Sequence, residues 1–438
     1  MSYRSGGHEV RGRGSGGWGK VEARVSEVEA ARFADLYDVE KHVAALNGGV
    51  LIEDPYPAFM ELRSAAPVHK GSVAELLGVP GASVAWRDAP CYSAFSFEAN
   101  DLALRENIIF SSTYYEGFTT RLFGRSILEM VGEEHRRYRA LVQPAFTPKR
   151  AQWWIDRWIA GLVDEAVTAF EPFGQAELNA ELCARIPLQT ITSSFGLTRE
   201  QALDFRERVA EDRSEGRAED TAAKTAALLA DVIADRRQRP QDDVITMLVE
   251  SEIEEDGQRH LLTDEEVLGF ARLILTAGSG TTWRQLGILL VGLLRDPVAL
   301  EAVRQDRSLL RGAIEEAVRW EPTDPIFRRL VSKDVTLCGV DLPAGAVLEM
   351  NLGAANRDPA RWEDPERFDI HRAPRANLGF AGGPHICLGM HVARAEMVVA
   401  MNAVLDRLRN VRFDPAAPLA RIIGLEHRGP NGLQVVFG

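Results

Sequence analysis

The chain has 438 residues, a formal net charge of −13 and a hydrophobic fraction of 45%, values that suit a globular protein with a large core. The acidic balance disfavours nucleic acid or an anionic membrane surface as a partner. No apolar run reaches the roughly 20 residues that span a bilayer, and the N-terminus lacks the apolar stretch of a secretory leader. Four widely spaced cysteines disfavour a disulfide scaffold or a zinc site, so we expect a cytoplasmic protein.

The N-terminal region differs from the rest in composition. Residues 1–20 are rich in Gly, Ser and Arg, bury too little apolar surface to order, and are predicted to form a disordered tail. Residues 21–54 have helical spacing and predict a lead-in helix. Two prolines then mark the start of a single predicted domain, residues 55–438, whose first helix begins at Tyr56.

Amphipathic helical patterns follow at residues 151–170, 218–237 and 243–255. We interpret the apolar stripe of the first pattern as core packing: Trp154, Trp158, Leu162, Ala166 and Phe170. The longest pattern covers residues 263–295, where Thr263 and Glu266 form a capping-box sequence. At about 1.5 Å per residue, this helix can cross a whole domain.

Short apolar runs near the C-terminus predict strands at residues 335–337, 340–342, 347–350 and 433–437, with a Pro-Ala-Gly turn at 343–345. Helical patterns still cover far more of the chain than these runs do. The sequence therefore predicts a mainly α fold with small β-sheets, an α+β class.

The segment Phe380-Ala-Gly-Gly-Pro-His-Ile-Cys387-Leu-Gly389 carries the strongest chemical signal. Its glycines let the backbone approach a flat, bulky group, because they have no Cβ. A helical pattern follows, and a helix N-terminus favours a thiolate. A single stabilised thiolate suits an axial ligand of haem iron, whereas a buried free cysteine is the structural alternative.

The middle of the longest helix reads Ala277-Gly-Ser-Gly-Thr281-Thr282. Each of its two glycines costs about 1 kcal/mol relative to alanine in a helix interior. This cost indicates a reason for them, such as a bulge that lets a ligand approach.

Two further helical pairs combine ionisable groups. Glu316 and Arg319 are three residues apart and share a helix face, as do His135 and Arg139, which are four apart. Taken alone, the first pair is most simply a surface ion pair of little energetic weight. The second could direct cationic groups at an anionic ligand.

Together these segments resemble the cytochrome P450 family. The family's ligand loop reads Phe, Gly, any, Gly, any, His or Arg, any, Cys, any, Gly. Matching positions here are Phe380, Gly383, His385, Cys387 and Gly389. Ala381 stands where the family usually has glycine. The resemblance implies the P450 fold, with haem b between the long central helix and the loop, and Cys387 as the iron ligand.

The central helix is similar to the family's Ala, Gly, any, acid, Thr, Thr segment. Four positions match, which implies that Ala277 and Gly278 line the distal side of the haem and that Thr281, followed by Thr282, assists oxygen activation. Gly280 stands where the family has Asp or Glu. We therefore expect proton delivery through water or the substrate, or through a carboxylate from elsewhere in the chain.

The resemblance also assigns structural and haem-binding residues. Glu316 and Arg319, with Arg367 of the Pro-Glu-Arg-Phe segment, are expected to form a buried lock; Arg361 and Arg372 are the nearby alternatives. The haem propionates are expected to meet four side chains: His135, Arg139, Arg329 and His385. The substrate pocket is expected to include Tyr114, Tyr115, Phe118, Ile326 and Phe327.

The resemblance implies a soluble, bacterial-type haem-thiolate monooxygenase that inserts one oxygen atom of O2 into a hydrophobic small molecule. Electrons would come from a separate ferredoxin and an NAD(P)H-dependent ferredoxin reductase, because the chain has no dinucleotide loop of its own. A candidate docking patch comprises Arg136, Arg137, Lys149 and Arg150, although a solvated helix face explains these residues equally well. The alternatives are a peroxide-driven haem-thiolate enzyme, favoured by Gly280, and a non-catalytic haem-thiolate protein.

Overall fold

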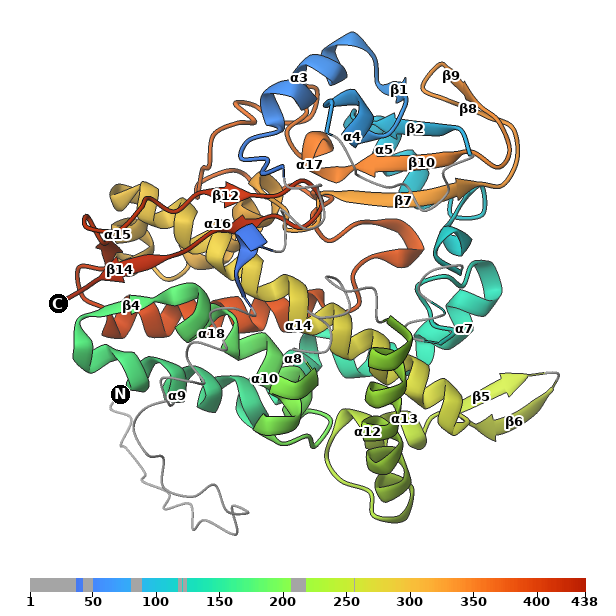
Figure 1. The fold of residues 1–438 in the computed structure, drawn as a ribbon, viewed down its shortest axis with the longest axis horizontal. Helices are drawn as coiled ribbons and strands as arrows, with labels where there is room; N and C mark the ends of the chain where they lie inside the picture. The colour runs from blue at the N-terminus through green and yellow to red at the C-terminus, as the bar shows by residue number, and fades with distance from the viewer. Residues whose placement is uncertain are drawn as a thin grey trace, which may run out of the picture.

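The computed structural model describes most of the chain: residues 37–41, 50–79, 89–116, 120, 124–205, 218–255 and 257–438. The predicted tail, and all of the predicted lead-in helix except residues 37–41 and 50–54, lie outside these ranges. Two regions are distinguishable in Figure 1: one built around a sheet near the top of the view, and one built of helices below it. The long helix α14 (Asp264–Arg295) crosses the molecule between them.

The upper region contains a five-stranded sheet in the order β1-β2-β10-β7-β3. Its strands are β1 (Val68–Lys70), β2 (Cys91–Ala94), β10 (Val347–Asn351), β7 (Ile326–Val331) and β3 (Phe110–Ser111). Only the β2–β10 pair is parallel. Four helices accompany this sheet (Figure 1): α3 (Tyr56–Ala65), α4 (Val73–Leu76), α5 (Phe97–Arg105) and α17 (Leu352–Ala355).

Smaller sheets complete the β structure. The β8–β9 hairpin (Val335–Leu337, Val340–Leu342) confirms two predicted strands, and β14 (Gln434–Val436) confirms the C-terminal one. Further pairings join β11 (Arg412–Phe413) to β14, β14 to β4 (Gln175–Glu177), and β12 (Ile422–Ile423) to β13 (Gly429–Pro430).

The lower region is helical, as the sequence predicts. Its helices, with the two that follow α14, are α7 (Gly132–Val142), α8 (Pro148–Trp154), α9 (Ala160–Phe170), α10 (Arg185–Ser193), α12 (Ala218–Gln238), α13 (Val244–Val249), α15 (Pro297–Gln305), α16 (Leu309–Trp320) and α18 (Met390–Arg407). The side chain of Thr263 caps α14 and Glu266 completes the capping box, as expected. The helix ends at Arg295, and Pro297 begins α15.

The predicted helix at residues 151–170 is interrupted by the π-helical segment η3 (Ile155–Ile159). A π turn contains one more residue than expected, so it shifts the buried face by one position. Trp154 remains fully buried, but Ile159 and Val163 then take the core positions predicted for Trp158 and Leu162, which are only partly buried. The prediction of core packing holds for Trp154, Ala166 and Phe170, and it was wrong in register only at Trp158 and Leu162.

The predicted helix at 243–255 was wrong in its second half. Asp243 caps α13, which ends at Val249, and the chain continues into the hairpin of β5 (Glu252–Glu255) and β6 (Gln258–Leu261). Gly257 lies in the turn with φ +74°, a left-handed conformation that glycine adopts at little cost. A turn residue therefore overrides the helical spacing that the acidic segment has in sequence.

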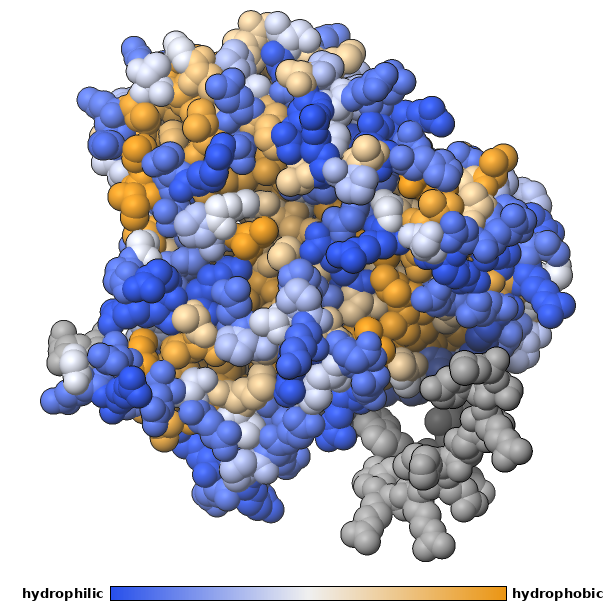
Figure 2. Space-filling model, turned by 180° about the vertical axis from the view of Figure 1, so that it is seen from behind, coloured by the Kyte–Doolittle hydropathy of each residue, from blue (hydrophilic) through white to orange (hydrophobic). Residues whose placement is uncertain are grey.

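Packing around α14 places the site. The largest hydrophobic cluster joins α9, α10, α14, α16 and α18, while a second lies against the five-stranded sheet. Seen from behind, polar residues cover most of the surface and apolar residues appear in patches between them (Figure 2). Among the described helices, none is long and apolar enough to cross a membrane.

Candidate active site around Cys387

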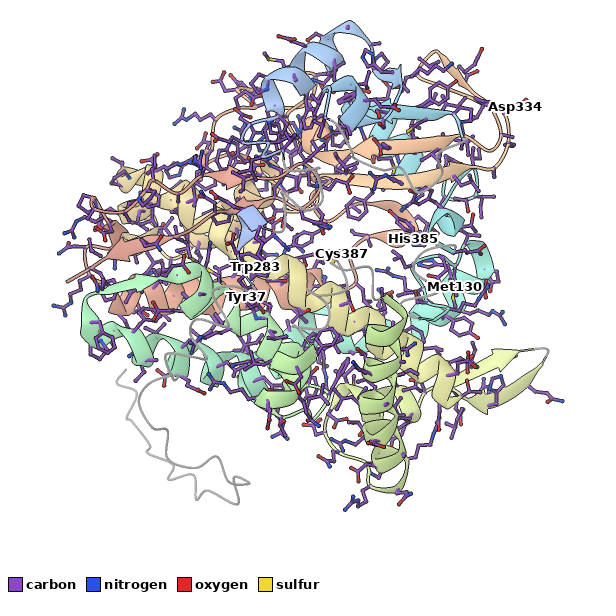
Figure 3. All side chains as sticks on the ribbon, in the orientation of Figure 1. Tyr37, Met130, Trp283, Asp334, His385 and Cys387 are labelled. Atoms are coloured by element: carbon purple, nitrogen blue, oxygen red, sulfur yellow. The ribbon has the colours of Figure 1, made fainter. Side chains whose placement is uncertain are left out.

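Cys387 lies in the middle of the molecule, next to α14 (Figure 3). It precedes α18, whose N-cap is Gly389. The Cys387 N–H donates to the carbonyl of Phe380 at 2.9 Å, and the Ile386 N–H donates to the carbonyl of Gly383 at 3.2 Å. These two backbone bonds fold the loop back on itself and fix the position of the sulfur.

Packing against α5 explains part of the glycine content of the loop. Gly383 has φ +62°, and a Cβ there would overlap the carbonyl oxygen of Leu104. Close packing against protein backbone, and not only the approach of a ligand, therefore requires glycine at position 383. Ala381 has φ +58°, so alanine in this left-handed position costs about 1 kcal/mol relative to glycine. A Cβ at Gly389, by contrast, would meet no atom within 4 Å.

The thiol of Cys387 responds to several neighbours. Burial raises its pKa, and the backbone N–H of Gly389 and the guanidinium groups of Arg139 and Arg394 lower it, while Asp324 raises it further. The Gly389 N–H at the start of α18 favours the thiolate, as expected, but burial outweighs it and the net direction of the pKa is upward. A bound metal ion reverses this balance, because it deprotonates a coordinating thiol.

Four cationic or neutral nitrogen side chains converge near the loop. His135 and Arg139 come from α7, Arg329 comes from β7, and His385 comes from the loop itself. The two imidazole rings lie 4.0 Å apart between centroids, and Arg139 donates to the carbonyl of Ile386 at 2.6 Å. We call these four residues the cationic cluster.

In the cationic cluster His135 and Arg329 are buried, and Arg139 and His385 are half-buried. Burial first, and then Arg139 and Arg329, lower the pKa of His135 to about 4. Burial, His135 and the same two arginines lower the pKa of His385 to about 2. No carboxylate is among the groups that shift either pKa. Within the described residues, His135 Nε2 and Arg329 Nε are buried and have no hydrogen-bond partner.

These features fit a haem. Buried donors and positive charges without an internal anion are what two propionates require. Arg139 joins the cluster to Cys387, because it donates to the carbonyl of Ile386, the residue before Cys387, and its charge lowers the pKa of the Cys387 thiol. The thiol can therefore bind iron from a position close to this cluster. In the part of the chain that the structure describes, no group of three or more His, Cys, Asp or Glu side chains could hold a metal ion.

The glycine pair in α14 has a different explanation from the expected bulge. The helix is continuous from Asp264 to Arg295. A Cβ at Gly278 would lie 2.8 Å from Cγ1 of Ile191 in α10, so helix packing accounts for this glycine. A Cβ at Gly280 would meet nothing within 4 Å. The expectation of a bulge was wrong, but Gly280 leaves space for a side chain.

Accessibility distinguishes one part of α14 around the predicted distal residues. Ala277 is exposed and Thr281 is half-buried, although Ser279, Gly280 and Thr282 around them are buried. The hydroxyl of Thr281 donates to the carbonyl of Ala277 at 3.1 Å. Of the predicted distal residues, these two therefore border an open space.

The predicted buried lock around Glu316 is present, but one of its two arginines differs from the prediction. Arg319 binds Glu316 at 2.7 Å, and both side chains are buried. The second arginine is Arg372, at 3.0 Å from Glu316, and not Arg367. Arg367 is exposed and contributes only its carbonyl, which accepts bonds from both arginines. The choice of Arg367 was wrong because the chain turns between it and Arg372.

The predicted pocket residues divide into separate groups. Tyr114 and Tyr115 stack edge to face at 5.2 Å, and Tyr115 accepts a hydrogen bond from the Arg328 N–H. Ile326 packs in a hydrophobic cluster with α3, whereas Phe327 packs against the five-stranded sheet. The two side chains therefore do not gather at one place. Phe118 lies outside the described residues.

Other residues at the site escaped the sequence interpretation. Ser112 Oγ lies 3.2 Å from His385 Nε2, and Arg394 lies over the ring of Phe380 at 4.7 Å. Asp324 Oδ1 lies 2.7 Å from His427 Nδ1. These contacts join positions far apart in the chain, so no local pattern signals them.

Two residues of the predicted docking patch are already paired. Arg136 binds Glu133, its neighbour on α7, and Arg150 lies 3.6 Å from Asp242. The patch is therefore less positive than its four cationic residues indicate.

A separate cavity of about 1040 Å³ opens between the 37–40 segment, α9, β4 and β14. Tyr37, labelled in Figure 3, lines this cavity. None of the predicted site residues lines it.

Comparison with known proteins agrees with this geometry. The family model described as Cytochrome P450 matches residues 189–416. Cyclomarin C epoxidase CymV of Salinispora arenicola is 33% identical over 69% of this chain and 78% of its own length. Cytochrome P450 monooxygenase PikC of Streptomyces venezuelae is 30% identical over 82% of this chain and 85% of its own.

A solved structure has the same fold over most of this chain. CYP109E1 from Bacillus megaterium, in complex with testosterone, superimposes with a TM-score of 0.76 at 28% identity. The match covers 88% of this chain and 99% of that protein. The chain therefore belongs to the cytochrome P450 family and is an oxidoreductase of its monooxygenase class.

Proposed function

We propose that the protein inserts one atom of O2 into a hydrophobic small molecule, with two electrons from a separate ferredoxin. The balanced reaction is RH + O2 + 2 e⁻ + 2 H⁺ → ROH + H2O, and NAD(P)H supplies the electrons through a ferredoxin reductase. The observation that carries the proposal is the grouping of Cys387, the cationic cluster and the accessible Thr281 face of α14. All four cysteines are free thiols, which supports a reducing cytoplasm as its location.

The residues divide the work of holding the cofactor. Cys387 Sγ would bind the iron, and the cationic cluster would bind the propionates with charge-assisted hydrogen bonds. Thiolate-bound haem supplies oxygen activation, because the sulfur favours O–O cleavage. The Glu316 network, formed by Glu316, Arg319 and Arg372, stabilises the fold and takes no part in the chemistry.

Thr281 holds a proton at the reaction site. Its Oγ1 donates to the Ala277 carbonyl within the same helix turn, and rotation about χ1 can redirect the hydroxyl towards the open side. Gly280 offers no carboxylate beside it. The proton that Thr281 passes on must therefore be replaced from water or from another acid.

An apolar substrate is supported by the relatives. The neighbour CYP109E1 holds testosterone, and aromatic side chains of Tyr114 and Tyr115 lie near the predicted pocket. Ligand pockets are mainly apolar with a few polar groups, which suits a hydrophobic substrate. The charged groups near Tyr114 belong to the Arg328 pairs with Glu349 and Glu426.

A titration of the purified haem protein would test the proposal. Testosterone, palmitic acid, a macrolide and a small aromatic would each be added while the absorption spectrum is recorded. We expect at least one compound to shift the spin state and then to be oxidised by ferredoxin, its reductase and NADPH. Absence of haem from the purified protein, or no oxidation of any responding compound, would contradict the proposal.

The second candidate is a peroxide-driven enzyme. The absence of a carboxylate at Gly280 favours it, since H2O2 brings both electrons and both protons. The same responding compound would be incubated with H2O2 in place of the ferredoxin system. Faster turnover with H2O2 than with ferredoxin would establish this alternative.

A further inference from the structure

Asp324 and His427 come together from distant parts of the chain. Asp324 lies in the loop between α16 and β7, and His427 lies in the turn between β12 and β13. Nδ1 of His427 is 2.7 Å from Oδ1 of Asp324. The side chains are 33% and 21% exposed, so solvent can reach the pair.

The neighbouring backbone fixes this pair. The Arg428 N–H donates to the carbonyl of Thr323 at 2.7 Å, and Thr323 Oγ1 donates to the carbonyl of Arg428 at 2.9 Å. Arg428 is itself buried against Glu321. Thr323 precedes Asp324 and Arg428 follows His427, so the two residues that bind each other are direct neighbours of the pair. This arrangement leaves little freedom for the side chains of Asp324 and His427 to separate.

A second contact joins the loop that carries Asp324 to α14. Gln285 accepts a hydrogen bond from the Thr323 N–H at 3.1 Å and donates to the carbonyl of Glu321 at 3.3 Å. Gln285 and Thr281 are four residues apart, so they share a helix face with a rise of about 6 Å between them. Asp324 follows Thr323 directly, so the loop that carries it is bound to α14 about one helical turn after Thr281.

Asp324 is also within electrostatic reach of the thiol. Burial is the main cause of the raised pKa of Cys387, and Asp324 adds to it, while Arg139 and Arg394 oppose it. The neighbouring carboxylates are occupied differently: Glu426 and Glu349 both pair with Arg328. Asp324 pairs with a histidine, a group that can gain and lose a proton near neutral pH.

We infer that Asp324 and His427 form a proton relay that serves the reaction site beside Thr281, where Gly280 supplies no acid. The inference rests on the proposed monooxygenase function. In the relay, protonated His427 gives its Nδ1 proton to Asp324 Oδ1, and Asp324 gives that proton to water or to Thr281 Oγ1. His427 takes a replacement proton from solvent. Two such transfers supply the two protons of the balanced reaction.

Asp324→Asn tests the relay in the haem-loaded enzyme, with testosterone as probe or, if it gives no response, palmitic acid. A positioned acid contributes about 10²–10⁴ in rate, so we expect a loss of at least about tenfold in product formed with ferredoxin and NADPH. Turnover with H2O2 should change little, because H2O2 carries its own two protons. His427→Gln should lower the ferredoxin-driven rate in the same direction. Asp341→Asn, which removes an exposed carboxylate on the β8–β9 hairpin, is the control and should retain the rate.

A second readout does not depend on turnover. The negative charge of Asp324 raises the pKa of the Cys387 thiol. Removing that charge should shift the iron midpoint potential in the positive direction. Spectroelectrochemical titration of Asp324→Asn measures this shift, and Asp341→Asn should show a smaller one. A purely structural role for Asp324 would not produce an ordered difference between these two carboxylates.

Rescue gives the sharpest test. A side chain fits at Gly280, because a Cβ there meets no atom within 4 Å. Gly280→Asp, added to Asp324→Asn, should restore most of the ferredoxin-driven rate. An unchanged rate in both Asp324→Asn and His427→Gln, or an equal loss with ferredoxin and H2O2, would overturn the relay. If the unmodified enzyme oxidises no probe, the proposed function fails instead.

Discussion

Two groups of buried charged side chains differ in whether their charges are balanced inside the protein. In the Glu316 network, one carboxylate accepts bonds from Arg319 and Arg372, and Arg319 also donates to the carbonyls of Asn356 and Pro365. Every strong donor of this network therefore meets a protein acceptor.

In the cationic cluster only some of the donors meet an acceptor: Arg139 donates to the carbonyl of Ile386, and Arg329 Nη1 donates to the carbonyl of Arg328. His135 Nε2 and Arg329 Nε are buried without a partner among the described residues, and burial lowers the pKa of both His135 and Arg329. Uncompensated buried charge is costly, so it persists only where an outside anion can satisfy it. Internal balance thus separates residues that hold the fold from residues that hold a ligand.

The largest effect should come from removing one partner of the balanced network. Arg319→Met leaves the buried carboxylate of Glu316 short of a partner and should destabilise the protein by about 3–5 kcal/mol. Chemical denaturation of the haem-loaded protein would measure this loss. Arg367→Ala is the control, because that side chain is exposed and only its carbonyl is used; a loss as large as that of Arg319→Met would contradict the assignment of Arg372.

The same substitution in the cationic cluster should have the opposite effect on the haem-free protein. Arg329→Met removes a buried charge that no internal anion compensates, so the haem-free protein should be as stable or more stable. Haem affinity should fall by about tenfold or more, through loss of a charge-assisted bond. Haem transfer to apomyoglobin would measure the affinity. Equal affinity in Arg329→Met and the unmodified protein would remove Arg329 from the propionate site.

The cluster should also make the haem-free protein sensitive to acid. His135 has its pKa lowered from 6.5 to about 4, so between these values the unfolded chain binds a proton that the folded protein does not. Stability is therefore complete above pH 6.5 and falls, by about 3 kcal/mol for this group, as the pH decreases to about 4. Urea denaturation across this pH range would measure the slope.

His135→Gln should flatten this slope, and His371→Gln, at an exposed histidine, should not. The haem-loaded protein should show a shallower slope than the haem-free one, because propionate anions favour the protonated rings. An identical slope with and without haem would contradict the proposed contact.

The smallest effect distinguishes the two glycines of α14 by what a new methyl group would touch. Gly278→Ala should destabilise by about 1–3 kcal/mol, because its Cβ would lie 2.8 Å from Ile191. Gly280→Ala should stabilise by up to about 1 kcal/mol, because the site is open and alanine favours helix. Thermal unfolding of both variants would measure the difference, and the same sign for both would refute the packing explanation.

Features that depend on residues close together in the sequence were easier to predict than features that depend on distant residues. Three features depend mainly on nearby residues and could be recognised in the sequence: the capping box of α14, the hairpin of β8 and β9, and the loop around Cys387. The π segment after Trp154 was not, because helical spacing alone does not reveal an added residue. The family pattern supplied the members of the cationic cluster, but not their missing acceptors.

Longer-range contacts could not be predicted. Arg372 binds Glu316 in place of the predicted Arg367, because the chain turns between the two arginines. Asp324 and His427 are 103 residues apart, and their pairing depends on how the β12–β13 hairpin packs against the loop after α16. A missing acid in a helix can be read from sequence, whereas its replacement requires the tertiary structure.

The absorption spectrum of the reduced, carbon monoxide-treated protein tests the central assignment most directly. The unmodified protein and Cys338→Ser, which alters a cysteine on the β8–β9 hairpin, should both show the band of thiolate-ligated haem. Cys387→Ser should lose that band. A thiolate band that persists in Cys387→Ser, or that is absent from the unmodified protein, would contradict the account of the site.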